Sequence, residues 1–187
     1  MYMKGLIAGI VILVLLGLGN FLINWQKQPT STVPNAPLGV LTYESPAAGI
    51  TFTYPSTYRV EARSDGFDGQ TIAVMTLINK DVVIPDYSEG PPAISIIAVP
   101  NPSNMPLDQW VRSKSISNFA LSIDQKLSAT TVEGEPALAY THSGLYESDA
   151  VAFVHNGKVY LLSVGWADAQ DAIRSDFQNL LKTITFK

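Results

Sequence analysis

The feature that most constrains this chain is an uninterrupted apolar stretch close to its N-terminus. Residues 5–23 read GLIAGIVILVLLGLGNFLI, nineteen positions without a charge, in which Asn20 is the single strongly polar side chain. A helix of this length rises about 28 Å, close to the roughly 30 Å hydrocarbon layer of a bilayer. The sequence therefore predicts that residues 1–27 form one N-terminal transmembrane helix with short flanks.

The alternative is an export signal that is cleaved off. Such signals have an apolar centre of about 7–15 residues followed by a small-residue A-x-A site, whereas this run is longer and leads into Asn24-Trp25-Gln26-Lys27. Trp25 is an aromatic residue of the kind found at the membrane–water boundary, and Lys4 precedes the helix. We expect an uncleaved signal-anchor in the cell membrane that leaves the rest of the chain on the extracytoplasmic side.

The remainder divides into a linker and one domain. Residues 28–40, QPTSTVPNAPLGV, combine three prolines with small polar residues, a composition that stays extended. Residues 41–187 have a globular composition and the length of a single domain. Beyond Lys27 the chain has ten Lys and Arg against sixteen Asp and Glu, so nucleic acid and anionic lipid surfaces are poor partners.

Alternation and turn signals predict a domain made mostly of strands. Apolar residues and threonines alternate over Ile50–Tyr54, which is typical of a half-buried strand. Asn156-Gly157 between two apolar runs is the strongest short hairpin signal, and Glu133-Gly134 is a second turn signal. Further strands are expected over residues 58–63, 71–78, 93–99, 126–132, 136–142, 150–155 and 158–165.

Two segments show helical periodicity. The first opens at Asn104-Met105-Pro106 and places Leu107, Trp110 and Val111 on one face. The second is expected to be capped by Asp168, with an apolar face made of Ala172, Ile173, Phe177, Leu180, Leu181 and Ile184. The chain therefore has the pattern of an α+β domain, a central antiparallel β-sheet with helices packed on it.

Several of these segments, in this order, resemble the PsbP/Mog1-like domains. Gly49–Tyr58, GITFTYPSTY, resembles the opening "GF-x-F-x-YP-x-x-W", with Tyr58 where Trp is usual. A helix with Leu107 and Trp110 follows. The later parts of the resemblance are TVEGEPA (131–137), NGKVYLL (156–162) and a closing helix and tail over 177–186.

The resemblance covers Thr42 to Lys187 and implies an α/β/α sandwich. Membrane-anchored bacterial members of this group are common; plant and cyanobacterial members assist photosystem II, and a yeast relative binds a small GTPase. The group shares no catalytic motif that could be carried over to this chain, so the resemblance informs the fold more than the function.

The sequence offers no catalytic constellation and no cofactor motif. The strings G-x-S-x-G, G-x-x-x-x-G-K-[ST] and G-x-G-x-x-G are absent. The two histidines, His142 and His155, are expected at opposite ends of paired strands, about 15 Å apart at 3.3 Å per residue, which is too far for one metal ion.

Acidic and aromatic residues in the expected loops are the remaining candidates for a site. Asp65 and Asp68 lie in a glycine-rich stretch that lacks the full D-x-D-x-D-G calcium spacing, while Asp86 and Glu89 lie, with Asp81, around a proline-rich loop. Glu147 to Asp149 is expected in a hairpin connection. Phe67 and Tyr87 are candidates for contact with a partner. Solvated loops are the simpler interpretation of all these residues.

Two functions remain open. The first is a membrane-anchored, non-enzymatic binding or assembly-assisting domain that recognises another protein of the bacterial envelope through its loops. The alternative is a domain that binds a metal or small ligand through the acidic loops.

Overall fold

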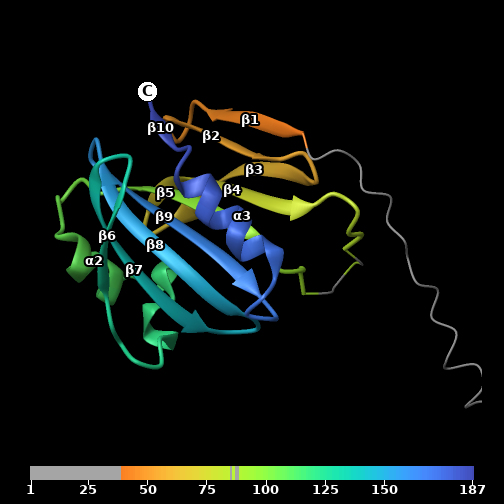
Figure 1. The fold of residues 1–187 in the computed structure, drawn as a ribbon. Helices are drawn as coiled ribbons and strands as arrows, with labels where there is room; N and C mark the ends of the chain where they lie inside the picture. The colour runs from red at the N-terminus through yellow and green to blue at the C-terminus, as the bar shows by residue number, and fades with distance from the viewer. Residues whose placement is uncertain (1–38, 85, 87–88) are drawn as a thin grey trace, which may run out of the picture. The chain divides into compact units, whose positions relative to one another are not determined.

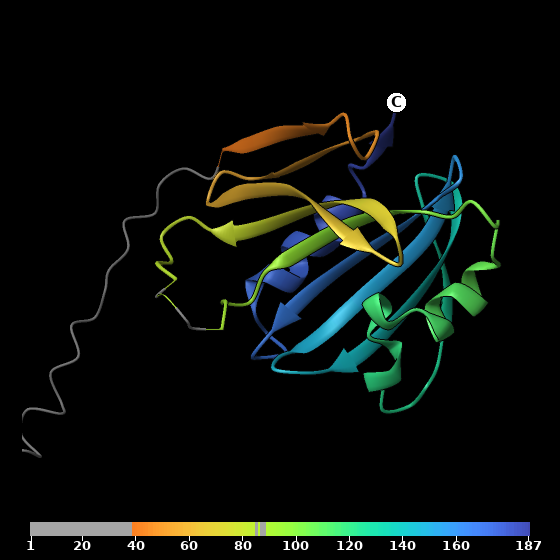
Figure 2. The same ribbon diagram turned by 180° about the vertical axis from the view of Figure 1, so that it is seen from behind.

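The domain consists of two antiparallel sheets with helices on both faces of the larger one (Figures 1 and 2). The computed structural model describes residues 39–84, 86 and 89–187. The large sheet has the order β3-β4-β5-β9-β8-β7-β6 and the small sheet the order β1-β2-β10. The strands of the large sheet are β3 (Tyr58–Phe67), β4 (Gln70–Asn79), β5 (Ile94–Pro100), β6 (Ser128–Val132), β7 (Glu135–Ser143), β8 (Glu147–His155) and β9 (Lys158–Trp166). Those of the small sheet are β1 (Val40–Ser45), β2 (Ile50–Pro55) and β10 (Thr185–Phe186).

Three hairpins of the large sheet are closed by two-residue turns in which both residues have positive φ. Asn156-Gly157 has φ of 46° and 71°, Glu133-Gly134 has 48° and 80°, and Asp68-Gly69 has 53° and 73°. Type I′ turns require this backbone because its twist matches that of the flanking strands. The hairpins predicted at Asn156-Gly157 and Glu133-Gly134 are therefore present. The stretch expected to be a loop at residues 65–69 is instead the end of β3 and a tight turn.

The large sheet is buried on both faces at its centre, where β5 pairs with β9 from Ile94↔Val164 to Pro100↔Lys158. On one face the core contains Met75, Leu77, Ile96 and Leu162. On the other it contains Val74, Val99, Val159 and Leu161. Central strands covered on both faces need apolar residues at nearly every position, which explains the continuous apolar runs of β5 and β9.

Each face is covered by different elements. The helix α3 (Ala172–Leu181) and the small sheet lie on one face, where Phe177 and Leu180 are buried. The helix α2 (Leu107–Ser113) and two short 3₁₀ turns, η1 (Ser115–Ser117) and η2 (Phe119–Leu121), lie on the other (Figure 2). Trp110 and Val111 of α2 are buried, in agreement with the predicted apolar face.

The predicted α+β class is confirmed for the residues that the structure describes. The predicted transmembrane helix and residues 1–38 lie outside them, and none of the helices within them is long and apolar enough to cross a membrane. Two strands were missed: β1, which begins at Val40, the last residue of the expected linker, and β10, which has only two residues.

Ile184, expected on the apolar face of the second helix, instead follows α3, which ends at Leu181. Two further local predictions were wrong. Asp168 does not cap α3, because the helix begins after Asp171, and the Asp168 side chain accepts a hydrogen bond from Gln170 N instead. The segment from Glu147 to Asp149 is part of β8, and the connection before it is Gly144-Leu145-Tyr146.

The Asn156-Gly157 turn makes a testable prediction. Gly157→Val forces a β-branched residue to φ of 71° and should lower the free energy of unfolding by about 1–2 kcal/mol. Gly66→Val is the matched control, since Gly66 lies in β3 without positive φ and a Cβ there would meet nothing within 4 Å. Denaturant unfolding of both variants checks the prediction, and equal stabilities would contradict it.

Candidate functional site

A groove lies between α3 and the edge strand β6, on the face of the large sheet that carries α3. It consists of two adjoining hollows of about 360 and 480 Å³, which share Ala139, Val151 and Gln178. We call it the α3–β6 groove. Its remaining lining residues are Asp124, Lys126, Ser128, Thr130, Thr131, Val132, Glu133, Tyr140, Thr141, Asp149, Ala150, Arg174, Phe177, Leu181 and Lys182.

The groove exists because α3 covers only part of its face and the strands beside it carry small side chains. The helix packs mainly on β2 and β9, so much of β6 and β7 is left open, although Ala137 and Val132 are buried in the same core (Figure 1). On this face β7 presents Ala137 and Ala139, and β6 presents Ser128 and Thr130. These short side chains do not fill the space beside the helix, and a hollow remains.

The most firmly held polar group of the groove is the Arg174 guanidinium. Its Nε and Nη2 donate to the two oxygens of Asp149 at 2.8 and 3.2 Å, and its Nη1 donates to Ala169 O at 3.0 Å. The guanidinium carbon also lies 4.4 Å from the centre of the Trp166 ring. Planar two-point pairing and stacking together fix the orientation of an arginine, so the positive charge is held in place beside the groove.

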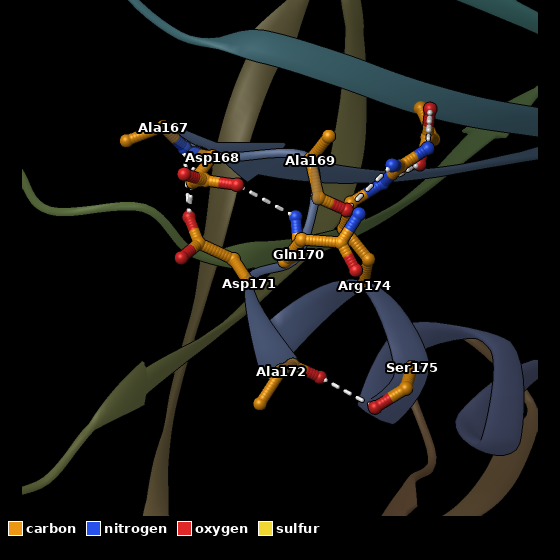
Figure 3. A network of polar contacts seen from close by, with 9 residues as sticks. Ala167, Asp168, Ala169, Gln170, Asp171, Ala172, Arg174 and Ser175 are labelled. Atoms are coloured by element: carbon orange, nitrogen blue, oxygen red, sulfur yellow. Dashed lines mark hydrogen bonds and ion pairs between the residues drawn. The ribbon is translucent and has the colours of Figure 1, made fainter.

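The loop between β9 and α3 holds the start of the helix, and with it Arg174 (Figure 3). One carboxylate oxygen of Asp171 accepts from Ala167 N and Asp168 N, both at 2.9 Å, while Asp168 accepts from Gln170 N at 2.8 Å. Aspartates that bond nearby backbone N–H groups stabilise tight loops. Asp168 and Asp171 therefore stabilise the conformation of this loop.

The acidic residues proposed as metal ligands are not brought together. Asp65 accepts from Gly66 N, and one of its carboxylate oxygens lies 3.7 Å from Arg63 Nε. Asp68 forms an ion pair with Lys114, which follows α2. Asp86 and Glu89 are exposed beside the loop before β5. Within the described parts of the chain, no three His, Asp or Glu side chains are grouped so that they could hold a metal ion.

Of the two aromatic residues considered for partner contact, the structure describes Phe67 but not Tyr87. Phe67 ends β3 and packs partly against the core on the α2 face, beside a small hollow that Trp110 and Lys114 also line. Tyr87 lies outside the described residues.

Buried titratable groups occur elsewhere in the domain. Burial lowers the pKa of His142, an effect that nearby Glu147 opposes, and Nδ1 of His142 has no hydrogen-bond partner among the described residues. Burial raises the pKa of the Tyr58 hydroxyl, which donates to Asp176 at 2.7 Å, and that of the Tyr140 hydroxyl, which donates to Ser117 O at 2.6 Å. Both tyrosines are thus hydrogen-bond donors of the core.

His155 ends β8, whereas His142 of β7 pairs with Ser148 near the start of β8. The two histidines therefore lie at opposite ends of the β7–β8 pair, as predicted. It pairs with Glu135 at 2.8 Å and stacks on Phe186 with ring centres 3.7 Å apart. It therefore anchors β10.

The fold is PsbP-like. The solution structure of cyanobacterial PsbP (CyanoP) from Synechocystis matches with a TM-score of 0.54 and 16% identity over 82% of this chain and 96% of that protein. A crystal structure from Bacteroides thetaiotaomicron matches with a TM-score of 0.49 and 16% identity, over 78% of this chain and 48% of the other. No protein-family model and no curated sequence matches.

The fixing of Arg174 is testable by a double-mutant cycle. The coupling free energy between Asp149→Asn and Arg174→Met should be about 1.5 kcal/mol, because the ion pair is bidentate and the Asp149 side chain is only 16% exposed. The same cycle on the exposed pair Arg59 and Glu61 should give about 0.5 kcal/mol or less. Denaturant unfolding measures both, and equal couplings would contradict the prediction.

Proposed function

We propose that this protein is a membrane-anchored, non-enzymatic binding or assembly-assisting module. Residues 5–23 hold it in the membrane with its domain on the extracytoplasmic side, and the domain recognises another envelope protein. The observation that carries the proposal is the α3–β6 groove, whose two adjoining hollows combine an apolar floor with the fixed guanidinium of Arg174. The groove, rather than the loops favoured by the sequence, is the recognition surface.

The chemistry of the groove suits a polypeptide. Its floor of Ala139 and Val151 accepts small apolar side chains, while Ser128, Thr130 and Gln178 offer neutral hydrogen-bonding groups. Its charges balance, since Lys126, Arg174 and Lys182 stand against Asp124, Asp149 and Glu133. A mixed apolar and polar surface without net charge is typical of protein interfaces. The PsbP-like fold supports the proposal, because the motifs behind the resemblance include no catalytic one.

The membrane part of the proposal predicts the behaviour of the full-length chain. It should stay in the membrane fraction after alkaline extraction, because an apolar helix of this length is not released by removal of surface contacts. Protease added from the outer side should degrade residues 28–187. Recovery of a soluble mature form that lacks about the first 25 residues would overturn the anchor.

The binding part of the proposal predicts where a partner is captured. A photo-crosslinking residue in place of Gln178, on the α3 wall of the groove, should link the full chain in native membranes to one discrete envelope protein. Thr141→Arg in the same chain should abolish the product by filling the groove with a charged side chain, because Thr141 of β7 lines the groove and is exposed. The same crosslinker in place of Glu61, on the far edge strand β3, is the control. Equal capture from both positions, or capture unaffected by Thr141→Arg, would contradict recognition through the groove.

A further inference from the structure

The two edges of the large sheet differ in how they resist pairing with another strand. The edge strand β3 carries Arg59, Glu61, Arg63 and Asp65 at alternate positions. Charges on an edge strand oppose the approach of a further strand. The opposite edge strand, β6, reads Ser-Ala-Thr-Thr-Val and has neither a charge nor a proline, and its first four residues are exposed. Only the β3 edge is therefore protected.

The backbone of β6 is ready for a further strand. It pairs with β7 in continuous register, from Ser128↔Ala139 to Val132↔Glu135, without a bulge. Alternate N–H and C=O groups of an edge strand point away from its neighbour. Apart from their ladder with β7, the backbone N–H and C=O groups of residues 128–132 make no backbone hydrogen bond within the described parts of the chain. A second extended strand would satisfy them.

The charges that flank β6 are complementary to those of a second, antiparallel β6. Lys126 precedes the strand and Glu133 follows it, and neither belongs to an ion pair with a described residue. When two identical strands run antiparallel, the beginning of each lies beside the end of the other. Lys126 of each copy then lies next to the partner's Glu133, and the twofold symmetry of the contact provides this match twice.

We propose that β6 pairs antiparallel with β6 of a second copy of this chain, with Thr130 on the twofold axis. Thr130 then faces the partner's Thr130, and Ala129 faces the partner's Thr131, cross-strand pairs that favour a sheet. The axis is perpendicular to the sheet, so the two seven-stranded sheets become one and both α3–β6 grooves open on the same side. This inference does not depend on the proposed function.

The absence of cysteine from the chain allows a direct test on the purified full-length protein in mild detergent. Thr130→Cys introduces one thiol on the axis, where facing Cβ atoms of neighbouring strands are about 5 Å apart. A short bifunctional thiol reagent should convert most of the protein to a covalent dimer. Glu61→Cys on the β3 edge is the control and should give at least fivefold less.

Charge reversal then tests the identity of the partner. In the Thr130→Cys background, Lys126→Glu alone and Glu133→Lys alone should each lower the dimer yield severalfold, and the two changes together should restore it. A mixture of the two singly reversed variants should form the mixed dimer in preference to either self-pair. The circular dichroism spectrum should be unchanged, because all of these side chains are exposed and the fold of each copy does not depend on them.

Three results would overturn the proposal. They are equal crosslinking from positions 130 and 61, a dimer yield that charge reversal leaves unchanged, or a product at position 130 whose mass shows a different protein on β6. Capture of an envelope protein from position 178 is measured separately, so failure of the dimer and failure of the proposed function are distinguishable.

Discussion

The pairing of β5 with β9 holds the domain together. The strands β3, β4 and β5 form one run of hairpins, and β6 to β9 form another, so each run is built from neighbours in sequence. Among the described strands, the ladder from Ile94↔Val164 to Pro100↔Lys158 is the connection that joins them into one sheet. Because both faces of this ladder are buried, the cores on the α2 and α3 faces both depend on it.

The groove follows from the same arrangement. After β5 the chain crosses one face as α2, η1 and η2, enters the far edge as β6 and returns by hairpins to β9. The helix α3 then follows β9 directly and packs on β9 and β2, near the centre of the sheet. The far strands β6 and β7 are out of its reach. Their small residues, such as Ala139, do not fill the space beside the helix, and the groove remains.

The sequence predicted the parts of this structure that depend on local chemistry. Asn156-Gly157 specified its hairpin through positive φ, and the alternation of Ile50–Tyr54 specified β2. The prediction that Asp168 caps α3 was wrong because the helix begins only after Asp171, whose carboxylate accepts from Ala167 N and Asp168 N and does not cap the helix. The pairing of Asp149 with Arg174, and the groove beside it, could not be predicted. Both depend on where α3 lies across strands that are distant in sequence.

The small sheet has a consequence for synthesis of the chain. The strand β2 lies between β1 and β10, and Lys187 N donates to Gly49 O at 3.1 Å. Elongation supplies residues from the N-terminus at about 5–20 per second, so β2 waits several seconds or more for the strand that completes its sheet. During that time the apolar side of β2, including Phe52, has no final cover from α3. Until α3 and β10 are made, this side of β2 is an uncovered apolar surface on the growing chain.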